Sequence, residues 1–267
     1  MNDLVKISMA HHVADVRLNR PEKYNALNPE MILAITSAGR QLALDKSVRA
    51  VVLSGEGSGF CAGLDFKEFV AIGAGEPVAV NLLQRENRDP GNFVQMAAMV
   101  WKQMPVPVLA ALHGVAIGGG LQIALGTDIR LAAPDTRLSV MEISWGIIPD
   151  MSITQTLRDL VRIDVAKELT FTARFVEARE AIQIGLVTRV CDNPHAEAHR
   201  LAAEIAAKNP HAISAAKQLL DATWHSPSGE GLALEDTLQR TLIGSPNQVE
   251  AVNANFEKRA PHFKDRD

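Results

Sequence analysis

The chain has few cysteines and no excess of positive charge. Cys61 and Cys191 are its only cysteines among 267 residues, too few for a disulfide framework and without the spacing of metal ligands. Both are predicted to be structural thiols in a cytoplasmic protein. The formal net charge of -4 gives no broad positive field for a nucleic-acid backbone or an anionic membrane. Any anionic ligand must therefore be bound by local groups.

The chain also lacks a long uninterrupted apolar run. Its most apolar region, residues 106–133, is interrupted by His113, Asp128 and a glycine cluster, so it cannot cross a bilayer as one helix. Residues 1–10 carry charges and lack the apolar segment of a secretion signal, so we interpret them as mature protein. The composition, 47% apolar and 22% charged, indicates a packed globular protein with no membrane partner.

Strand and helix patterns alternate through the first two-thirds of the chain, which indicates an α/β fold. Strands are predicted where short runs are rich in β-branched residues, and helices where apolar residues recur with a period of 3.6. The predicted strands are 13–18, 48–53, 106–112, 129–132 and 138–141, and the predicted helices are 29–44 and 118–125.

The last third is entirely helical in pattern, with Asn-Pro and Ser-Pro pairs between the helices. Its predicted helices are 196–208, 212–225, 231–243 and 248–258. Few of them have a long apolar face, so we expect them to pack on the core or on neighbouring subunits. We therefore divide the chain into a core, residues 1–194, and a helical oligomerisation region, residues 195–267. Residues 72–80 are the candidate for a mobile loop over a site.

Two glycine-rich segments, residues 54–65 and 113–122, each lie between a predicted strand and a helix. Either segment alone could be a surface turn or a place of close helix-strand packing. A dinucleotide site is disfavoured, because Glu76 lies in a glycine-proline loop and not at a strand end. Together, the segments could direct two backbone N–H groups at one oxygen, as acyl chemistry requires.

Residues 19–27, 60–65 and 113–120 together resemble the crotonase or enoyl-CoA hydratase/isomerase superfamily, and the match continues through 167–187 and 256–259. The resemblance implies a crotonase-like spiral of ββα units with a C-terminal helical trimerisation region. It also implies a homotrimer or a homohexamer. The substrate would be an acyl-CoA thioester, with CoA carried as part of the substrate and no other cofactor.

The resemblance further implies an oxyanion hole, formed by the backbone N–H groups of Leu64 and Gly119, for the thioester oxygen. Lys258 could reach the phosphates of CoA from a neighbouring subunit. On the same basis, the residues that border CoA or the acyl group are Lys23, Ala26, Ala62, Leu64, Asp65, Phe66, Lys67 and Gly119.

Three further positions bear on the reaction. Hydratases of the family use two glutamates, and the matching residues here are Gln122 and Glu142. Gln122 can hold water but cannot exchange a proton at neutral pH. Asp150 stands where dienoyl-CoA isomerases carry an aspartate, although those enzymes also have an aspartate at the position of Gln122. We therefore predict a double-bond isomerase that uses Glu142 and Asp150, since two carboxylates can move a proton between carbons.

Two alternatives within acyl-CoA chemistry stay open. One is hydration of trans-2-enoyl-CoA, with Gln122 orienting the water, and the other is a catalytically weak acyl-CoA-binding protein. Outside the family context, Glu142 would be a surface carboxylate at a strand edge and Asp150 an ordinary turn residue after proline.

Other classes of function are disfavoured. RNA binding occurs in one branch of the superfamily through a lysine-rich helix, but here residues 30–46 offer only Arg40 and Lys46 as cations. The histidine pair 11–12 and His113 lack a second set of ligands at metal spacing. We therefore expect these histidines to be structural and the protein to bind no metal.

Overall fold

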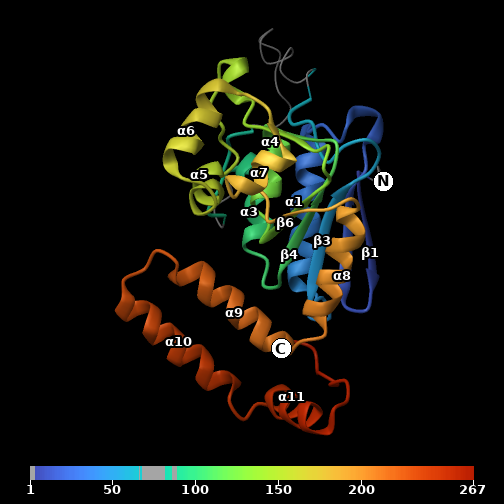
Figure 1. Ribbon diagram of the computed structural model, residues 1–267, viewed down its shortest axis with the longest axis vertical. Helices are drawn as coiled ribbons and strands as arrows, with labels where there is room; N and C mark the ends of the chain where they lie inside the picture. The colour runs from blue at the N-terminus through green and yellow to red at the C-terminus, as the bar shows by residue number, and fades with distance from the viewer. Residues whose placement is uncertain (1–3, 66, 68–81, 86–88) are drawn as a thin grey trace.

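The computed structural model describes residues 4–65, 67, 82–85 and 89–267, which form a mixed α/β fold (Figure 1). The loop predicted at residues 72–80 lies outside the described residues. Within the described part, no helix is long and apolar enough to cross a membrane.

The fold contains a large sheet and a small one. The strands of the large sheet are, in spatial order, β1 (Val5–Ala10), β2 (Val13–Leu18), β3 (Ala50–Gly55), β4 (Val108–Leu112), β6 (Ile129–Ala132) and β9 (Arg189–Val190). Only the β1–β2 pair is antiparallel in this sheet. The small sheet contains β5 (Val115–Ile117), β7 (Arg137–Ser139) and β8 (Val176–Glu177).

Helices connect and cover the sheets. The α-helices are α1 (Pro29–Leu44), α3 (Phe93–Lys102), α4 (Gly119–Leu125), α5 (Ile153–Thr156), α6 (Ile163–Thr172), α7 (Ala178–Gln183), α8 (Pro194–Ala206), α9 (Pro210–Thr223), α10 (Ser228–Leu242) and α11 (Pro246–Glu257). The 3-10 helices are η1 (Pro21–Lys23), η2 (Glu142–Trp145) and η3 (Leu157–Asp159).

The predicted elements are present, but several of the helices begin earlier than predicted. The bounds predicted for β2, α1 and β6 agree with the structure. In contrast, α8, α9 and α11 each begin two residues before the predicted start, at Pro194, Pro210 and Pro246. Proline fits the first helical position because its missing N–H would have no partner there. These prolines therefore start the helices and do not merely separate them.

The central strands of the large sheet, β3 and β4, are buried on both faces, whereas β1 is mostly exposed. Val51 and Leu53 of β3 face the cluster formed with α1, α3 and α4, while Ala50 and Val52 face α8. This explains why β3 has a continuous apolar sequence instead of an alternating one. On the opposite side, three alanines at helical spacing allow α8 to approach the sheet closely: Ala198, Ala202 and Ala206. Figure 1 shows α8 along the sheet, whereas α9, α10 and α11 project from the body.

A buried charge lies beneath α8. Asp15 of β2 is 7% exposed, and its Oδ1 lies 3.1 Å from Nε2 of His195 and 3.3 Å from Nε2 of His199. Its Oδ2 accepts a 2.8 Å hydrogen bond from Arg17 Nε. Burial alone would raise the pKa of Asp15, but contacts with His195, His199 and Arg17 hold that pKa far below its usual range. The carboxylate is thus ionised and joins α8 to the sheet.

Helix α4 packs its first turn directly on another backbone segment. A Cβ placed on Gly120 would lie 2.5 Å from the carbonyl oxygen of Cys61 and 2.8 Å from its Sγ. No real side chain tolerates these distances, so the two segments would have to separate.

We predict that Gly120→Ala destabilises the fold. The free energy of unfolding should fall by about 1–3 kcal/mol, because the added methyl overpacks a backbone contact. Gly229→Ala in α10 is the matched control, since nothing lies within 4 Å of its Cβ position, and it should leave stability unchanged or raise it by up to about 1 kcal/mol. Denaturant unfolding of both variants tests this, and equal effects would contradict it.

Candidate active site

The two glycine-rich segments lie side by side. Cys61 N–H donates to the carbonyl of Val115, and Ile117 N–H donates back to the carbonyl of Cys61, each at 3.0 Å. On its other side, the first segment pairs with Leu27, whose N–H donates to the Gly63 carbonyl at 2.7 Å. Residues 61–65 are therefore held between Leu27 and β5.

This pairing determines where the Leu64 N–H points. Leu27 bonds to the residues before and after Leu64, through the Gly63 carbonyl and the Asp65 N–H. In a parallel bridge of this kind, the N–H of the central residue points away from its partner. Leu64 therefore presents its N–H on the side opposite Leu27.

Gly119 lies close to this segment. It is the first residue of α4, and the first N–H groups of a helix have no partner within the helix. A Cβ on Gly63, which has a φ of +84°, would lie 3.5 Å from the Gly119 nitrogen and 2.7 Å from the carbonyl oxygen of Ile117. The preceding Gly118 has φ +54° and ψ −123°, a conformation that suits glycine. Glycine at position 63 is thus required for the close approach of the two segments that carry the Leu64 and Gly119 N–H groups.

Glu142 begins η2, shortly after strand β7 of the small sheet, and it is only 7% exposed. Its Oε1 accepts a 2.6 Å hydrogen bond from Nε2 of Gln122. Among the described residues, no group hydrogen-bonds its buried Oε2. A Cβ on Gly118 would lie 3.3 Å from Oε1, so the carboxylate lies beside the start of α4. The interpretation of Glu142 as a surface carboxylate is therefore wrong.

Gln122 connects Glu142 to the segment that carries Asp150. It is 1% exposed, and its side-chain oxygen accepts a 2.8 Å hydrogen bond from the N–H of Met151. Both ends of the amide thus bind protein groups, and one of them fixes the carboxylate of Glu142. Gln122 can therefore act as a positioning residue.

The two carboxyl groups influence each other. Burial raises the pKa of Glu142, the hydrogen bond from Gln122 opposes that rise, and the charge of Asp150 adds to it. Burial likewise raises the pKa of Asp150, which is partly exposed. A carboxyl group with a raised pKa exchanges protons more readily near neutral pH.

The side chains expected to border CoA differ in their exposure and in their contacts within the protein. Lys23 and Lys67 are exposed, Ala62 is half-buried, and Ala26 is 8% exposed. Asp65 is instead occupied within the protein, because it pairs with Arg20 at 2.7 Å and accepts a hydrogen bond from the Lys67 N–H. Phe66 lies outside the described residues.

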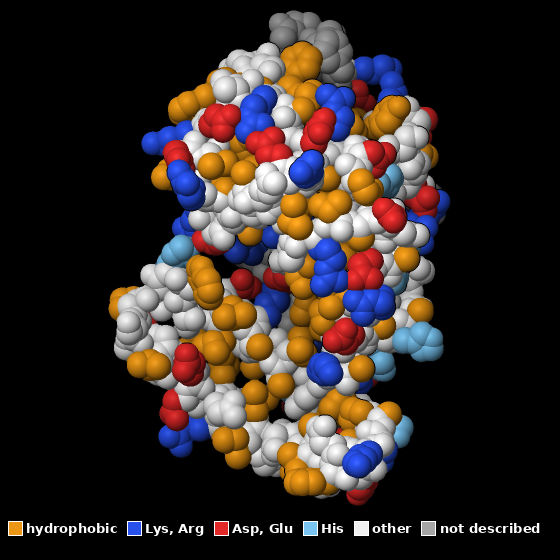
Figure 2. Space-filling view, viewed as in Figure 1, with side chains coloured by type: hydrophobic (Ala, Val, Ile, Leu, Met, Phe, Trp, Pro, Cys, Tyr) orange, Lys and Arg blue, Asp and Glu red, His pale blue; other side chains and the backbone are white. Residues whose placement is uncertain are grey.

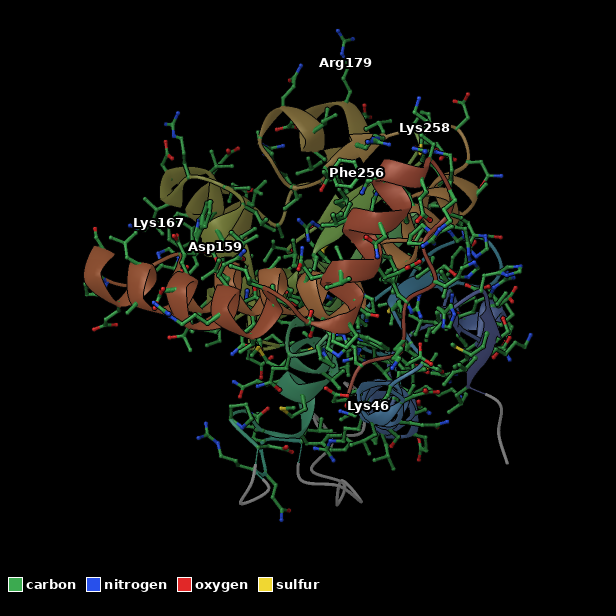
Figure 3. All side chains as sticks on the ribbon, turned by 90° about the horizontal axis from the view of Figure 1, so that it is seen from below. Lys46, Asp159, Lys167, Arg179, Phe256 and Lys258 are labelled. Atoms are coloured by element: carbon green, nitrogen blue, oxygen red, sulfur yellow. The ribbon has the colours of Figure 1, made fainter. Side chains whose placement is uncertain are left out.

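Lys258 lies far from these groups within one chain. It caps the C-terminal end of α11, close to Phe256 (Figure 3). Figure 1 shows α11 at the opposite end of the molecule from α4. A role for Lys258 at the site thus needs a second subunit, as the resemblance implied.

Sequence reasoning missed the residue that shapes the first segment. Asn25 is fully buried, and its side-chain nitrogen donates to the carbonyls of Glu56, Gly59 and Phe60 at 2.9–3.1 Å. Asn25 has a positive φ of 56°, a conformation in which asparagine is enriched. The position of Asn25 within the family-like segment 19–27 was the available signal.

Comparisons with known proteins identify the family to which this chain is similar. The family model for enoyl-CoA hydratase/isomerase matches residues 8–266. A Bacillus subtilis protein that carries an enoyl-CoA hydratase/isomerase name is 36% identical over 258 residues, which cover 95% of each chain. Human mitochondrial methylglutaconyl-CoA hydratase is 32% identical over 257 residues, which cover 92% of this chain and 72% of that protein.

Solved structures show the same fold. An enoyl-CoA hydratase from Bacillus anthracis matches with a TM-score of 0.86 at 29% identity, covering 98% of this chain and 99% of that one. The predicted crotonase-like fold is thereby confirmed. The chain belongs to the enoyl-CoA hydratase/isomerase family of the crotonase superfamily, and it is an enzyme of that family.

Proposed function

We propose that this enzyme shifts a double bond within an enoyl-CoA thioester, with Glu142 as the base. The observation that carries the proposal is the environment of that carboxylate: Gln122 holds one oxygen, and the other has no hydrogen-bond partner among the described residues. The second carboxyl group near Glu142 is Asp150, since residue 122 is an amide. This pair can remove and return a proton without activating water.

The proposed reaction passes through an enolate. Glu142 removes a proton from carbon 2 of a 3-enoyl thioester, and the electron pair moves toward the thioester oxygen. The N–H groups of Leu64 and Gly119 stabilise the negative charge on that oxygen. Protonation of carbon 4 by Glu142 or Asp150 then gives the conjugated 2-enoyl thioester. A 3,5-dienoyl thioester would react in the same way, with the proton returned at carbon 6.

Hydration of trans-2-enoyl-CoA is the second candidate, and the names of the relatives favour it. The human relative is a methylglutaconyl-CoA hydratase, and the Bacillus anthracis structure is an enoyl-CoA hydratase. In this chain, hydration would use Glu142 with Asp150 as the second acid, because Gln122 carries no exchangeable proton at neutral pH.

We also propose that the chain forms a homotrimer or homohexamer through residues 195–267. Figure 2 shows hydrophobic side chains gathered on the projecting helices. Trp224 is 67% exposed, Ile243 66% and Phe256 84%, which is unusual for large apolar side chains of a monomer. Lys258, beside Phe256, would then contact CoA bound to a neighbouring subunit. Lys23 and Lys67 would contact CoA bound to their own subunit.

No cofactor beyond the CoA of the substrate is needed for either reaction, and we propose a cytoplasmic location. Both cysteines are free thiols, in keeping with a reducing compartment. Burial raises the pKa of the Cys61 thiol to about 12, so this group is not a nucleophile at neutral pH.

A parallel assay of trans-2-enoyl-CoA, 3-enoyl-CoA and 3,5-dienoyl-CoA tests the proposed reaction. Conjugated-thioester absorbance should rise with either of the last two substrates, with no change in product mass. A mass increase of one water on the 2-enoyl ester, without isomerisation of the others, would establish the hydratase instead.

Glu142→Gln should abolish turnover while the protein stays folded. We expect kcat to fall by about 10²–10⁴-fold, because the variant has no base at the acyl chain. Asp150→Asn should reduce kcat less, since Glu142 can return the proton itself. Asp135→Asn, at an exposed turn, is the matched control and should not change kcat. Turnover by Glu142→Gln at the native rate would refute the assignment.

The raised pKa of Glu142 also predicts how stability depends on pH. A folded-state pKa above the ordinary 4.5 means that ionisation of Glu142 opposes folding at higher pH. Glu142→Gln should therefore be more stable than the native protein at pH 8, and this difference should shrink as pH falls toward 4.5. Denaturant unfolding across that range measures it. If the native protein is the more stable of the two at pH 8, the raised pKa of Glu142 is contradicted.

Gln122→Glu should raise hydration of trans-2-enoyl-CoA. The new carboxyl group would lie within hydrogen-bond distance of Glu142, and the pair would share a proton at neutral pH. That proton supplies the second acid, so we expect hydration to rise about tenfold or more. Gln155→Glu is the control, because Gln155 is exposed. If the rate of hydration is unchanged, the amide at position 122 is not what limits the addition of water.

A further inference from the structure

The cluster beneath α8 has the composition of a metal site. His195 and His199 are four residues apart on α8, so both side chains lie on one face of the helix. Asp15 reaches them from β2. One imidazole nitrogen of each histidine and one carboxylate oxygen of Asp15 all lie within 4.8 Å of one another. Two imidazoles and one carboxylate are a donor set that suits zinc and its neighbours in the first transition row.

The two distances from Asp15 to the histidines fit four-coordinate geometry. Zinc binds imidazole nitrogen and carboxylate oxygen at about 2.0–2.1 Å, so two ligands of a tetrahedral site are separated by about 3.3–3.4 Å. Oδ1 of Asp15 lies 3.1 Å from Nε2 of His195 and 3.3 Å from Nε2 of His199. Small side-chain rotations would thus suffice to close the site around an ion.

One ligand atom is poorly satisfied within the fold, because its 3.3 Å contact with Oδ1 of Asp15 lacks hydrogen-bond geometry. Nε2 of His199 is buried, and among the described residues no group forms a hydrogen bond of suitable geometry with it. A buried polar atom without a partner is costly, and a bound ion would satisfy it. Asp15 is also oriented as a single-oxygen ligand, because Arg17 binds its other oxygen, Oδ2, at 2.8 Å.

A fourth ligand can enter from solvent. Asp15 lines a surface hollow together with Ser8, which lies directly across from it in the β1–β2 pair. Arg17 and Glu56 form another part of the wall. Water from this hollow could complete the coordination of an ion at the three protein ligands.

We propose that Asp15, His195 and His199 bind Zn²⁺ or a similar late first-row divalent cation, which joins α8 to the large sheet. The site is distinct from the catalytic groups, because β2 and α8 contribute none of them. Its role is structural: α8 leads directly into α9, α10 and α11, so the ion strengthens the attachment of these helices to the core.

The proposal is tested with full-length, tag-free protein treated with a chelator and titrated with ZnCl₂ in a calorimeter. We expect one zinc ion per chain. At a hundredfold excess over Kd, zinc should raise the thermal unfolding midpoint by roughly 5 °C. Co²⁺ in place of Zn²⁺ should give the visible absorbance of a four-coordinate ion.

Single substitutions locate the ion. His195→Gln and His199→Gln should each weaken zinc binding by at least about tenfold, and Asp15→Asn should do the same. His262→Gln is the control, because its imidazole is exposed in the C-terminal tail. Circular dichroism and acyl-CoA turnover verify that each variant is folded. Turnover is a suitable check because β2 and α8 contribute none of the proposed catalytic groups. Absence of stoichiometric binding, or native affinity in the two histidine variants, would overturn the proposal and leave an ion pair only.

Discussion

The close approach of two backbone segments, residues 61–64 and the start of α4, is the constraint on which the site depends. Glycines make it possible: a Cβ on Gly63 would lie 2.7 Å from the Ile117 carbonyl oxygen, and one on Gly120 would lie 2.5 Å from the Cys61 carbonyl oxygen. Backbone groups, unlike long side chains, lose little freedom when they bind an oxygen, because the fold has already fixed them. The glycines therefore permit the close packing on which the proposed pair of N–H donors depends.

Gln122 links this backbone frame to the acid–base chemistry. It belongs to α4, whose first residue, Gly119, is one of the proposed donors, and its side chain binds both Glu142 and the Met151 N–H. An amide at this buried position adds no charge. A carboxylate would repel Glu142 and raise its pKa further, whereas the amide hydrogen bond favours the ionised base. An amide at position 122 thus favours one ionised carboxylate, Glu142, over two coupled acids.

Local sequence signals predicted most of the core and part of the site. Alternation located β2, apolar runs located β3, β4 and β6, and glycine spacing located the two segments that lie side by side. Other features depend on contacts between distant residues. Gln122 and Met151 are 29 positions apart, and only the fold reveals their hydrogen bond. Helix α3 was not predicted, although Asn92 and Gln95 form a capping box at its start.

The predicted start of α8 shows how a small error can hide a cluster of side chains. Placing the helix start after His195 left that residue in a loop, so its spacing of four from His199 carried no meaning. Pro194 at the first helical position puts both imidazoles on one face. The partner, Asp15, lies 180 residues from His195 in sequence, and strand alternation could not indicate which helix would cover it.

The packing of α8 explains why polar contacts matter there. Ala198, Ala202 and Ala206 permit a close approach to the sheet, but each alanine buries little apolar area. Contacts to the buried Asp15 therefore supply a larger share of the attachment than they would beneath a leucine-rich helix. The chain continues from α8 into the projecting helices, so α8 is where these helices join the sheet. An ion here would strengthen that junction without altering the chemistry at Glu142.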